Sequence, residues 1–250
     1  MPVVRKVASF GLILWLLLAP QVRSDDYLVA SADRCVILLH GLFRSSLSLK
    51  PMQWYLDHAG YTTVNLSYPS LLYPIPELAE MAVTQSLRTC HSRGAHQINF
   101  VTYSFGGILV RQYASVQPIQ GMQRAGMLGP PDGGSHVAFY YSSFEFLQPI
   151  ESDVLVQLGK GDESILLTLG PVAFELDVIA STIPDITLLP SFPDELSDGT
   201  VSLSEARVPG VKELLTMPVT HTVMILNPEV MRHSDEVERG MHLGLVIALL

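Results

Sequence analysis

Short apolar segments alternate with helical ones along most of the chain, and this alternation constrains the fold most. The run at 36–39 is continuous and uncharged, which is typical of a strand buried on both faces of a parallel sheet. Further strands are expected at 61–66, 98–103, 124–128, 174–180 and 213–217. Helices are expected at 48–59, 77–93 and 106–115, and a last one begins at the Asn227-Pro228 cap and ends at Gly240. Repeated strand–helix units predict an α/β domain with a parallel sheet.

Composition narrows the class of protein. The chain has 250 residues, of which 48% are hydrophobic and 16% charged, and this excludes disorder and a coiled coil. The formal net charge is −9 and no segment is strongly basic, so no nucleic-acid partner is expected. Six of the eight histidines are scattered without ligand spacing and the two cysteines form no CxxC pair, so neither a metal site nor a cofactor is expected.

The first 24 residues have the layout of an export signal. Arg5 and Lys6 precede an uncharged stretch at 7–19, and cleavage is expected after Ser24. The alternative is an uncleaved anchor, but the stretch is shorter than the roughly 20 residues that span a bilayer. We therefore expect a secreted or periplasmic protein that keeps no stable membrane span after cleavage. The mature chain at 25–250 is expected to be one domain with 12 basic and 24 acidic residues.

Ser104 is the candidate nucleophile. It lies between the expected strand at 98–103 and a helix that opens with Gly106-Gly107. A serine at such a junction is held in a tight turn with its hydroxyl exposed, and its neighbours must be small because strand and helix nearly touch. The segment 102–106 fits the G-x-S-x-G pattern except that Thr102 replaces the first glycine. The alternative is a buried turn serine without a chemical role.

A serine hydroxyl needs a general base, and His221 is the candidate. It follows the last expected strand, in a loop at 218–222, and loops at strand ends commonly carry catalytic residues. His233 and His242 are the alternatives. His233 falls within the last helix, where we expect an ordinary surface histidine, and His242 lies near the chain end.

The base needs a carboxylate to fix its tautomer, and Asp198 is the candidate. It lies in a loop after the strand at 174–180, and Gly199 behind it suits a tight turn. Asp185, Asp194 and Glu195 occur in the same stretch and remain alternatives.

An oxyanion would need two backbone N–H donors. One is expected from Phe105, directly after the nucleophile, and the other from Leu42, in the loop after the first strand. His40 is expected to shape that loop by hydrogen bonding. A metal-ligand role for His40 would lack partner ligands.

An apolar substrate cleft is expected beside these groups. Phe43 and Tyr103 are the candidate substrate-binding residues, together with aromatic side chains at 139–146. The alternative is that these aromatics only cover the sheet. The stretch 132–171 around them is expected to be an irregular, cap-like insert too short for a large lid.

Three segments together resemble the α/β-hydrolase family, and within it the secreted bacterial lipases and esterases. They are 36–42, 100–108, and 198–202 leading to His221, and the likeness spans about 34–239. The order Ser104, Asp198, His221 is that of this fold. The chain departs from the family at Thr102, which replaces glycine, and at Tyr103, where histidine is common.

The resemblance implies a mostly parallel central sheet with helices on both faces. It implies Ser104 as nucleophile, His221 as base, Asp198 as the acid that orients it, and backbone donation from Leu42 and Phe105. The family's strand order also implies a disulfide between Cys35 and Cys90.

The expected function is hydrolysis of carboxylic esters with short or medium acyl chains, through an acyl-enzyme. The small acyl ester or lipid would be the only partner, and the acidic surface argues against anionic membranes. Two alternatives stay open, because a fold does not fix a substrate. One is a serine hydrolase or acyltransferase that acts on amides or thioesters, and the other is a non-catalytic binding protein on a hydrolase scaffold. The uncharged tail at 243–250 is left without a role.

Overall fold

A computed structural model describes residues 33–138, 153–185 and 195–240. Six parallel strands form one sheet in the order β2-β1-β3-β4-β5-β6. The strands are β1 (Arg34–Leu39), β2 (Thr62–Asn65), β3 (Gln97–Tyr103), β4 (Met122–Leu128), β5 (Glu175–Ser181) and β6 (Glu213–Met217). The helices are η1 (Ser46–Leu49), α3 (Lys50–His58), α4 (Ile75–Ser92), α5 (Phe105–Val116), α7 (Asp153–Leu158), η3 (Ile165–Thr168), η4 (Met224–Leu226) and α8 (Pro228–Glu238).

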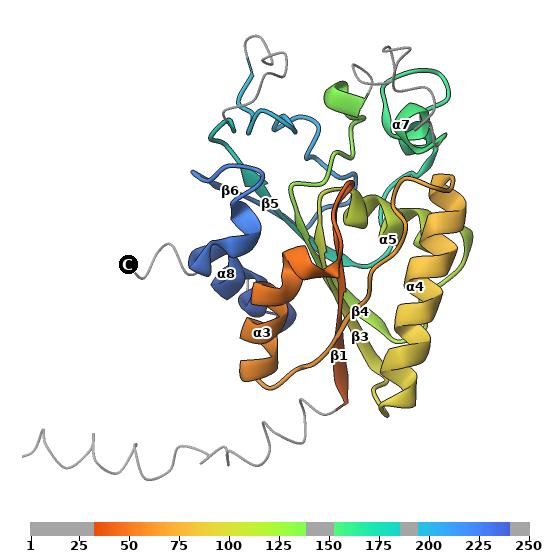
Figure 1. Cartoon of the computed structure of the whole chain (residues 1–250), viewed down its shortest axis with the longest axis vertical. Coiled ribbons are helices and arrows are strands. Elements are labelled where there is room, and N and C mark those ends of the chain that lie inside the picture. The colour runs from red at the N-terminus through yellow and green to blue at the C-terminus, as the bar shows by residue number, and fades with distance from the viewer. Residues whose placement is uncertain (1–32, 139–152, 186–194, 241–250) are drawn as a thin grey trace, which may run out of the picture.

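Helices cover both faces of the sheet (Figure 1). Helices α4 and α5 pack on one face, and α3 and α8 pack on the other. Successive residues of β1 contribute to the two cores in turn, because side chains of a strand alternate between the faces. Ile37 belongs to the core under α4 and α5, and Leu38 belongs to the core under α3 and α8. Both faces are therefore buried, which explains the continuous apolar run of β1.

The register of the sheet brings the candidate site together. Leu39 at the end of β1 lies beside Thr102 near the end of β3, and Tyr103 lies beside Leu128 at the end of β4. The loops that follow these strands, which hold Leu42 and Ser104, therefore meet at the carboxyl edge of the sheet. Ligands of open α/β sheets bind at this edge.

The structure differs from the expected elements at several boundaries. Helix α4 begins at Ile75, two residues early, because Pro74 is its N-cap and Pro76 occupies the first turn, where proline is tolerated. A 3-10 turn, η1, precedes α3, so α3 itself begins at Lys50. The stretch 132–171 is not wholly irregular, since its described part contains α7 and η3. The aromatic residues at 139–146 lie outside the described residues.

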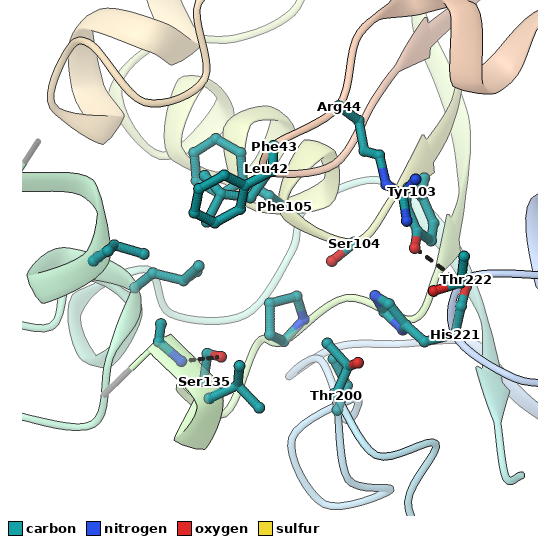
Figure 2. Close-up of a pocket in the computed structure, with 16 residues that line it drawn as sticks. Leu42, Phe43, Arg44, Tyr103, Ser104, Phe105, Ser135, Thr200, His221 and Thr222 are labelled. Atoms are coloured by element: carbon teal, nitrogen blue, oxygen red, sulfur yellow. Dashed lines mark hydrogen bonds between the residues drawn. The ribbon is translucent and has the colours of Figure 1, made fainter. Parts of the chain in front are cut away.

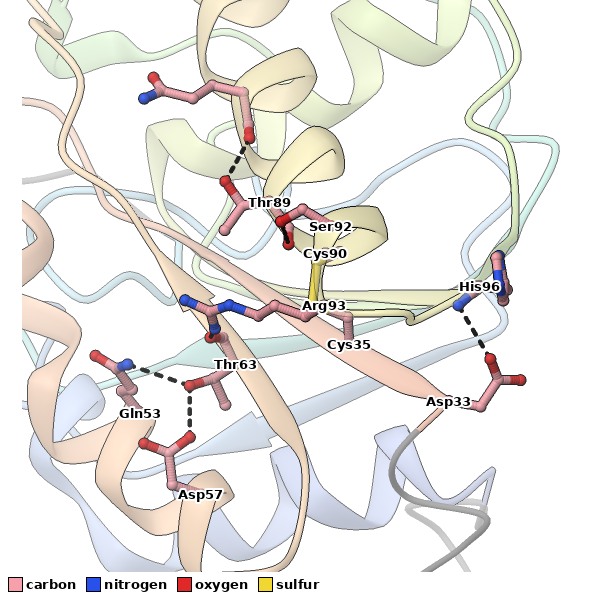
Figure 3. The surroundings of a disulfide bond; sticks show 11 residues. Asp33, Cys35, Gln53, Asp57, Thr63, Thr89, Cys90, Ser92, Arg93 and His96 are labelled. Atoms are coloured by element: carbon pink, nitrogen blue, oxygen red, sulfur yellow. Dashed lines mark hydrogen bonds between the residues drawn. A yellow bond between two sulfur atoms is a disulfide. The ribbon is translucent and has the colours of Figure 1, made fainter.

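A disulfide joins the two cysteines, as Figure 3 shows. Cys35, near the start of β1, is bonded to Cys90, in the last turn of α4, and both are fully buried. The bond ties the sheet to one covering helix at the end opposite Ser104. It closes a sequence separation of 55 residues.

Among the helices of the described residues, none combines the length and the apolar composition that a bilayer crossing requires. The expected signal at 1–24 and the tail at 243–250 lie outside the described residues.

Candidate active site

Ser104 occupies a strained turn between β3 and α5. Its φ is 52° and its ψ is −120°, in a region that a residue with a side chain rarely adopts. The turn is held on both sides, because the Ser104 N–H donates to the Leu128 carbonyl at 2.7 Å and the Gly107 N–H donates to the Ser104 carbonyl at 3.0 Å. The side chain is partly exposed and lines a cavity (Figure 2).

The glycine after this turn permits a very close backbone approach. A Cβ built on Gly106 would lie 2.4 Å from the Leu39 carbonyl oxygen and 3.0 Å from that of His40. Such distances are well below a normal contact, so only glycine fits here without moving β1. The G-x-S-x-G pattern therefore requires glycine at 106 because the backbone of β1 lies against this position.

His221 and Asp198 form a buried pair. The His221 Nδ1 lies 2.8 Å from an Asp198 carboxylate oxygen, with the two side chains 6% and 1% exposed. That oxygen also accepts a short hydrogen bond from the Ser181 hydroxyl, and the other accepts from the Thr200 and Val201 N–H groups at 2.9 and 2.7 Å. Burial acts to raise the pKa of Asp198, but the hydrogen bond and charge of His221 and the other donors outweigh it and hold the pKa below its ordinary value. The carboxylate is thus kept ionised beside the imidazole.

The His221 ring is held in place by its neighbours. The Tyr103 hydroxyl donates to the His221 carbonyl at 3.2 Å, and the two rings lie 5.1 Å apart. A Cβ at Gly129 would come within 3.0 Å of the imidazole, so this glycine gives the ring its space. With Nδ1 bound to Asp198, Nε2 is the nitrogen left for Ser104. Among the described residues no hydrogen bond joins Ser104 to His221, which is common in sites without substrate.

The alternative acids have other partners. Asp185 accepts from the Thr222 N–H and hydroxyl at 3.0 and 2.9 Å, so it fixes the residue after His221. Glu195 accepts from the N–H and hydroxyl of Ser204. Asp194 lies outside the described residues.

His233, one of the two alternative bases, does not line the cavity. The expectation that His233 is a surface residue is wrong, because its side chain is buried and its Nδ1 lies 2.9 Å from Glu236 on the same helix. His242 lies outside the described residues. His40 is buried and stacked on Tyr68, and it bonds the Gly41 carbonyl and the Tyr68 N–H through its two ring nitrogens. Burial lowers the pKa of His40, so its ring stays neutral and holds the loop before Leu42 through these hydrogen bonds.

The expected oxyanion donors, Leu42 and Phe105, both line the cavity with Ser104. Phe105 is the first residue of α5, so its N–H has no partner within the helix. Among the described residues no backbone carbonyl accepts from the N–H of Leu42 or Phe105.

The cavity has a volume of about 280 Å³. Phe43 and Tyr103, the expected substrate-binding residues, both line it. Its other apolar lining residues are Leu42, Phe105, Pro131, Val137, Ala138, Leu155, Leu158 and Val201. Helix α7, which was not expected, thus supplies part of the wall.

Two residues at or near the site were not singled out from the sequence. Glu205 is 1% exposed and accepts from the N–H groups of Ser202 and His136, each at 2.9 Å, and from Lys160 at 2.8 Å. It therefore joins the loop of Asp198 to the cavity wall. Its signal was the Ser-x-x-Glu spacing at 202–205, which forms the reciprocal bonds of a capping box. Arg44 is the second residue, and it lines the cavity beside Tyr103 (Figure 2).

No family model and no curated protein matches the chain. Solved structures do match it. The mature lipase BlEst2 of Bacillus licheniformis is 19% identical, with a TM-score of 0.61, and the match covers 78% of this chain and 87% of that one. The metagenomic carboxyl esterase MGS0156 is 17% identical with a TM-score of 0.63, and the match covers 78% of this chain and 66% of that one. Aspergillus fumigatus lipase B is 15% identical with a TM-score of 0.59, and the match covers 80% of this chain and 51% of that one. The chain thus spans just under two thirds and about half of the length of the last two. These likenesses and the parallel sheet show that the chain has the α/β-hydrolase fold.

Proposed function

We propose that this chain is a serine hydrolase of carboxylic esters. One observation carries the proposal: Ser104, strained on the turn before α5, opens into the same cavity as His221, whose Nδ1 is bound to the buried Asp198. The structural neighbours reported above are lipases and an esterase, and they support ester hydrolysis at the general level.

The geometry supports a two-step acyl transfer. The Ser104 hydroxyl oxygen attacks the ester carbonyl carbon while its proton passes to Nε2 of His221. The carbonyl oxygen becomes an oxyanion, which the N–H groups of Leu42 and Phe105 would stabilise. The intermediate collapses, the bond to the alcohol oxygen breaks, and His221 gives its proton to that oxygen. Water then repeats the sequence on the acyl-enzyme and releases the acid and free Ser104.

The cavity indicates the size of the acyl group. Its volume of about 280 Å³ lies just below the roughly 300–1,000 Å³ that is typical of ligand pockets. Its walls are mainly apolar, which favours a hydrocarbon chain. We therefore propose short or medium acyl chains as substrates.

We further propose that the protein works outside the cytoplasm. The export-type layout of residues 1–24 supports this, and so does the Cys35–Cys90 disulfide, because such bonds persist in oxidising compartments. Mass spectrometry of the protein recovered from its producing cell should find Asp25 as its first residue. An intact Met1 would contradict the cleavage.

The test is hydrolysis of p-nitrophenyl esters from acetate to palmitate by the purified chain and by Ser104→Ala. We expect turnover that is highest at short or medium chains and falls by at least about 10³-fold in the variant. Ser115→Ala, which removes an exposed hydroxyl on the same helix, is the control and should keep full activity. A folded wild type that hydrolyses none of these esters would refute the proposal, and equal turnover by Ser104→Ala would refute the role of Ser104.

A further inference from the structure

The cavity has two chemically different ends on either side of Ser104. Figure 2 shows Leu42, Phe43 and Phe105 together on one side. Arg44, Tyr103, His221 and Thr222 lie together on the other side. An ester bound at Ser104 would therefore place one of its halves against hydrocarbon and the other against polar groups.

The position of His221 decides which half goes where. In the proposed reaction His221 must hand its proton to the oxygen of the departing alcohol, so this oxygen has to lie within hydrogen-bond reach of Nε2. The alcohol half therefore occupies the end that holds His221, Thr222 and Arg44. The acyl half is left with the apolar end.

Arg44 is the one residue with a permanent charge among the described residues that line the cavity. It is exposed, and no ion pair to it occurs within residues 33–138, 153–185 and 195–240. Two acids near this end have other partners, since Asp185 accepts hydrogen bonds from both donors of Thr222 and Asp198 is bound to His221. The guanidinium interacts with the Tyr103 hydroxyl, which is an uncharged group, so no described protein group neutralises its positive charge.

We propose that the preferred substrates are esters whose alcohol carries an anionic group, a carboxylate or a phosphate, and that Arg44 binds this group. The inference rests on the proposed ester hydrolysis and names the class of alcohol. A guanidinium is planar and matches either anion with two parallel hydrogen bonds, which are stronger than those between neutral groups. The chain has a net charge of −9, so an anionic substrate gains nothing from the overall field and depends on this local cation.

The test uses two chromogenic butyrate esters that differ by one charge. They are p-nitrophenyl butyrate and 5-butyryloxy-2-nitrobenzoate, whose leaving group is the same nitrophenol with an added carboxylate. For the wild type we expect a higher kcat/KM on the anionic ester, and a preference that weakens as salt screens the exposed charge. Arg44→Gln should lower kcat/KM on the anionic ester ten- to a hundredfold more than on the neutral ester. Arg44→Lys keeps the charge but loses the planar fork, so its kcat/KM on the anionic ester should lie between those of the wild type and Arg44→Gln.

Arg88→Gln is the matched control, because it removes the same charge from an exposed position on α4 and should change neither ester. Monobutyrylglycerol compared with its 3-phosphate then separates phosphate from carboxylate as the preferred anion. An equal loss on both chromogenic esters in Arg44→Gln, or no preference in the wild type, would overturn the role of Arg44 and leave the ester hydrolase intact. Absence of turnover on both esters in the folded wild type would instead remove the proposed function itself.

Discussion

Replacing Gly106 by alanine should separate the two candidate oxyanion donors. The new methyl group would lie 2.4 Å from the Leu39 carbonyl oxygen, and contacts of a Cβ essentially never fall below 3.0 Å. Helix α5 and the end of β1 must therefore move apart by at least 0.6 Å. The obstacle is backbone, so no side-chain rotation relieves it. Leu39 leads into the loop of Leu42, and Gly106 follows Phe105. The movement should therefore change the distance between the N–H groups of Leu42 and Phe105.

The size of the effect follows from this displacement. Misplacing reacting groups by about 1 Å costs about 10²-fold, and losing one oxyanion donor costs about 10²–10³-fold. We expect kcat of Gly106→Ala to fall about 10- to 100-fold with KM little changed, because the oxyanion exists only in the transition state. Overpacking should cost about 1–3 kcal/mol of stability, offset by up to about 1 kcal/mol from the helix preference of alanine.

Gly107→Ala is the control on the same helix. Its Cβ would lie 3.0 Å from the Met127 sulfur and 3.2 Å from the Thr102 hydroxyl oxygen, so the obstacle is side chain and not backbone, and a shift of a few tenths of an ångström relieves it. We expect its kcat to stay within threefold of the wild type and its melting temperature to hold or rise. Both variants are assayed with p-nitrophenyl butyrate after titration of active Ser104, so that partial unfolding is not read as lost catalysis. If Gly106→Ala keeps kcat within twofold, the close approach does not set the oxyanion geometry and the reasoning fails.

Two further predictions concern stability. Replacing Cys35 and Cys90 together by alanine should lower the free energy of unfolding by up to about 4 kcal/mol, which is the loop entropy for a separation of 55 residues. It should leave kcat unchanged, because the bond lies about 20 Å along β3 from Ser104. A change in kcat of the folded variant would contradict this. Burial raises the pKa of Asp132 to about 6, against the attraction of its buried partner Arg111. The folded protein therefore holds the Asp132 proton more tightly than the unfolded chain does, and the contribution of this residue to stability falls as the pH rises from about 4 to 6. In denaturant titrations, the free energy of unfolding of Asp132→Asn should therefore rise relative to that of the wild type between pH 4 and 7, by about 1.4 kcal/mol per unit of pKa shift. A difference in unfolding free energy that is independent of pH would refute the assignment.

Much of the fold could be predicted because its signals are local. The run at 36–39 was found from hydrophobicity alone, since strands buried on both faces are nearly continuous in apolar residues. The cap at Asn227 was found from its type, and its side chain does accept from the N–H groups of Glu229 and Val230. Boundaries were missed where prolines are ambiguous: Pro74 and Pro76 suggest a loop, but they start α4.

The candidate site could be predicted only in part, because its partners meet through the sheet. Ser104 has a local pattern, whereas the contact between Asp198 and His221 spans 23 residues and depends on β5 and β6 being neighbours. His233 was misjudged because helix position alone cannot say which face packs on α3 and β4. Arg44 is adjacent to the expected cleft residue Phe43, yet a charge in a loop usually means solvent, and only the three-dimensional arrangement shows that it faces the cavity.

Backbone strain gives an argument for the site that does not use the sequence pattern. Two non-glycine residues of the described chain have positive φ, Phe43 at 57° and Ser104 at 52°, and both line the same cavity. Each such conformation costs about 1–3 kcal/mol and persists only where surrounding structure enforces it. At Ser104 the bonds to Leu128 and from Gly107 do so. A bulky residue such as Phe43, 63% exposed, gains little burial in return. Its conformation is therefore better explained by what it does for the loop that presents Leu42 and Arg44 to the cavity than by the stability of the fold.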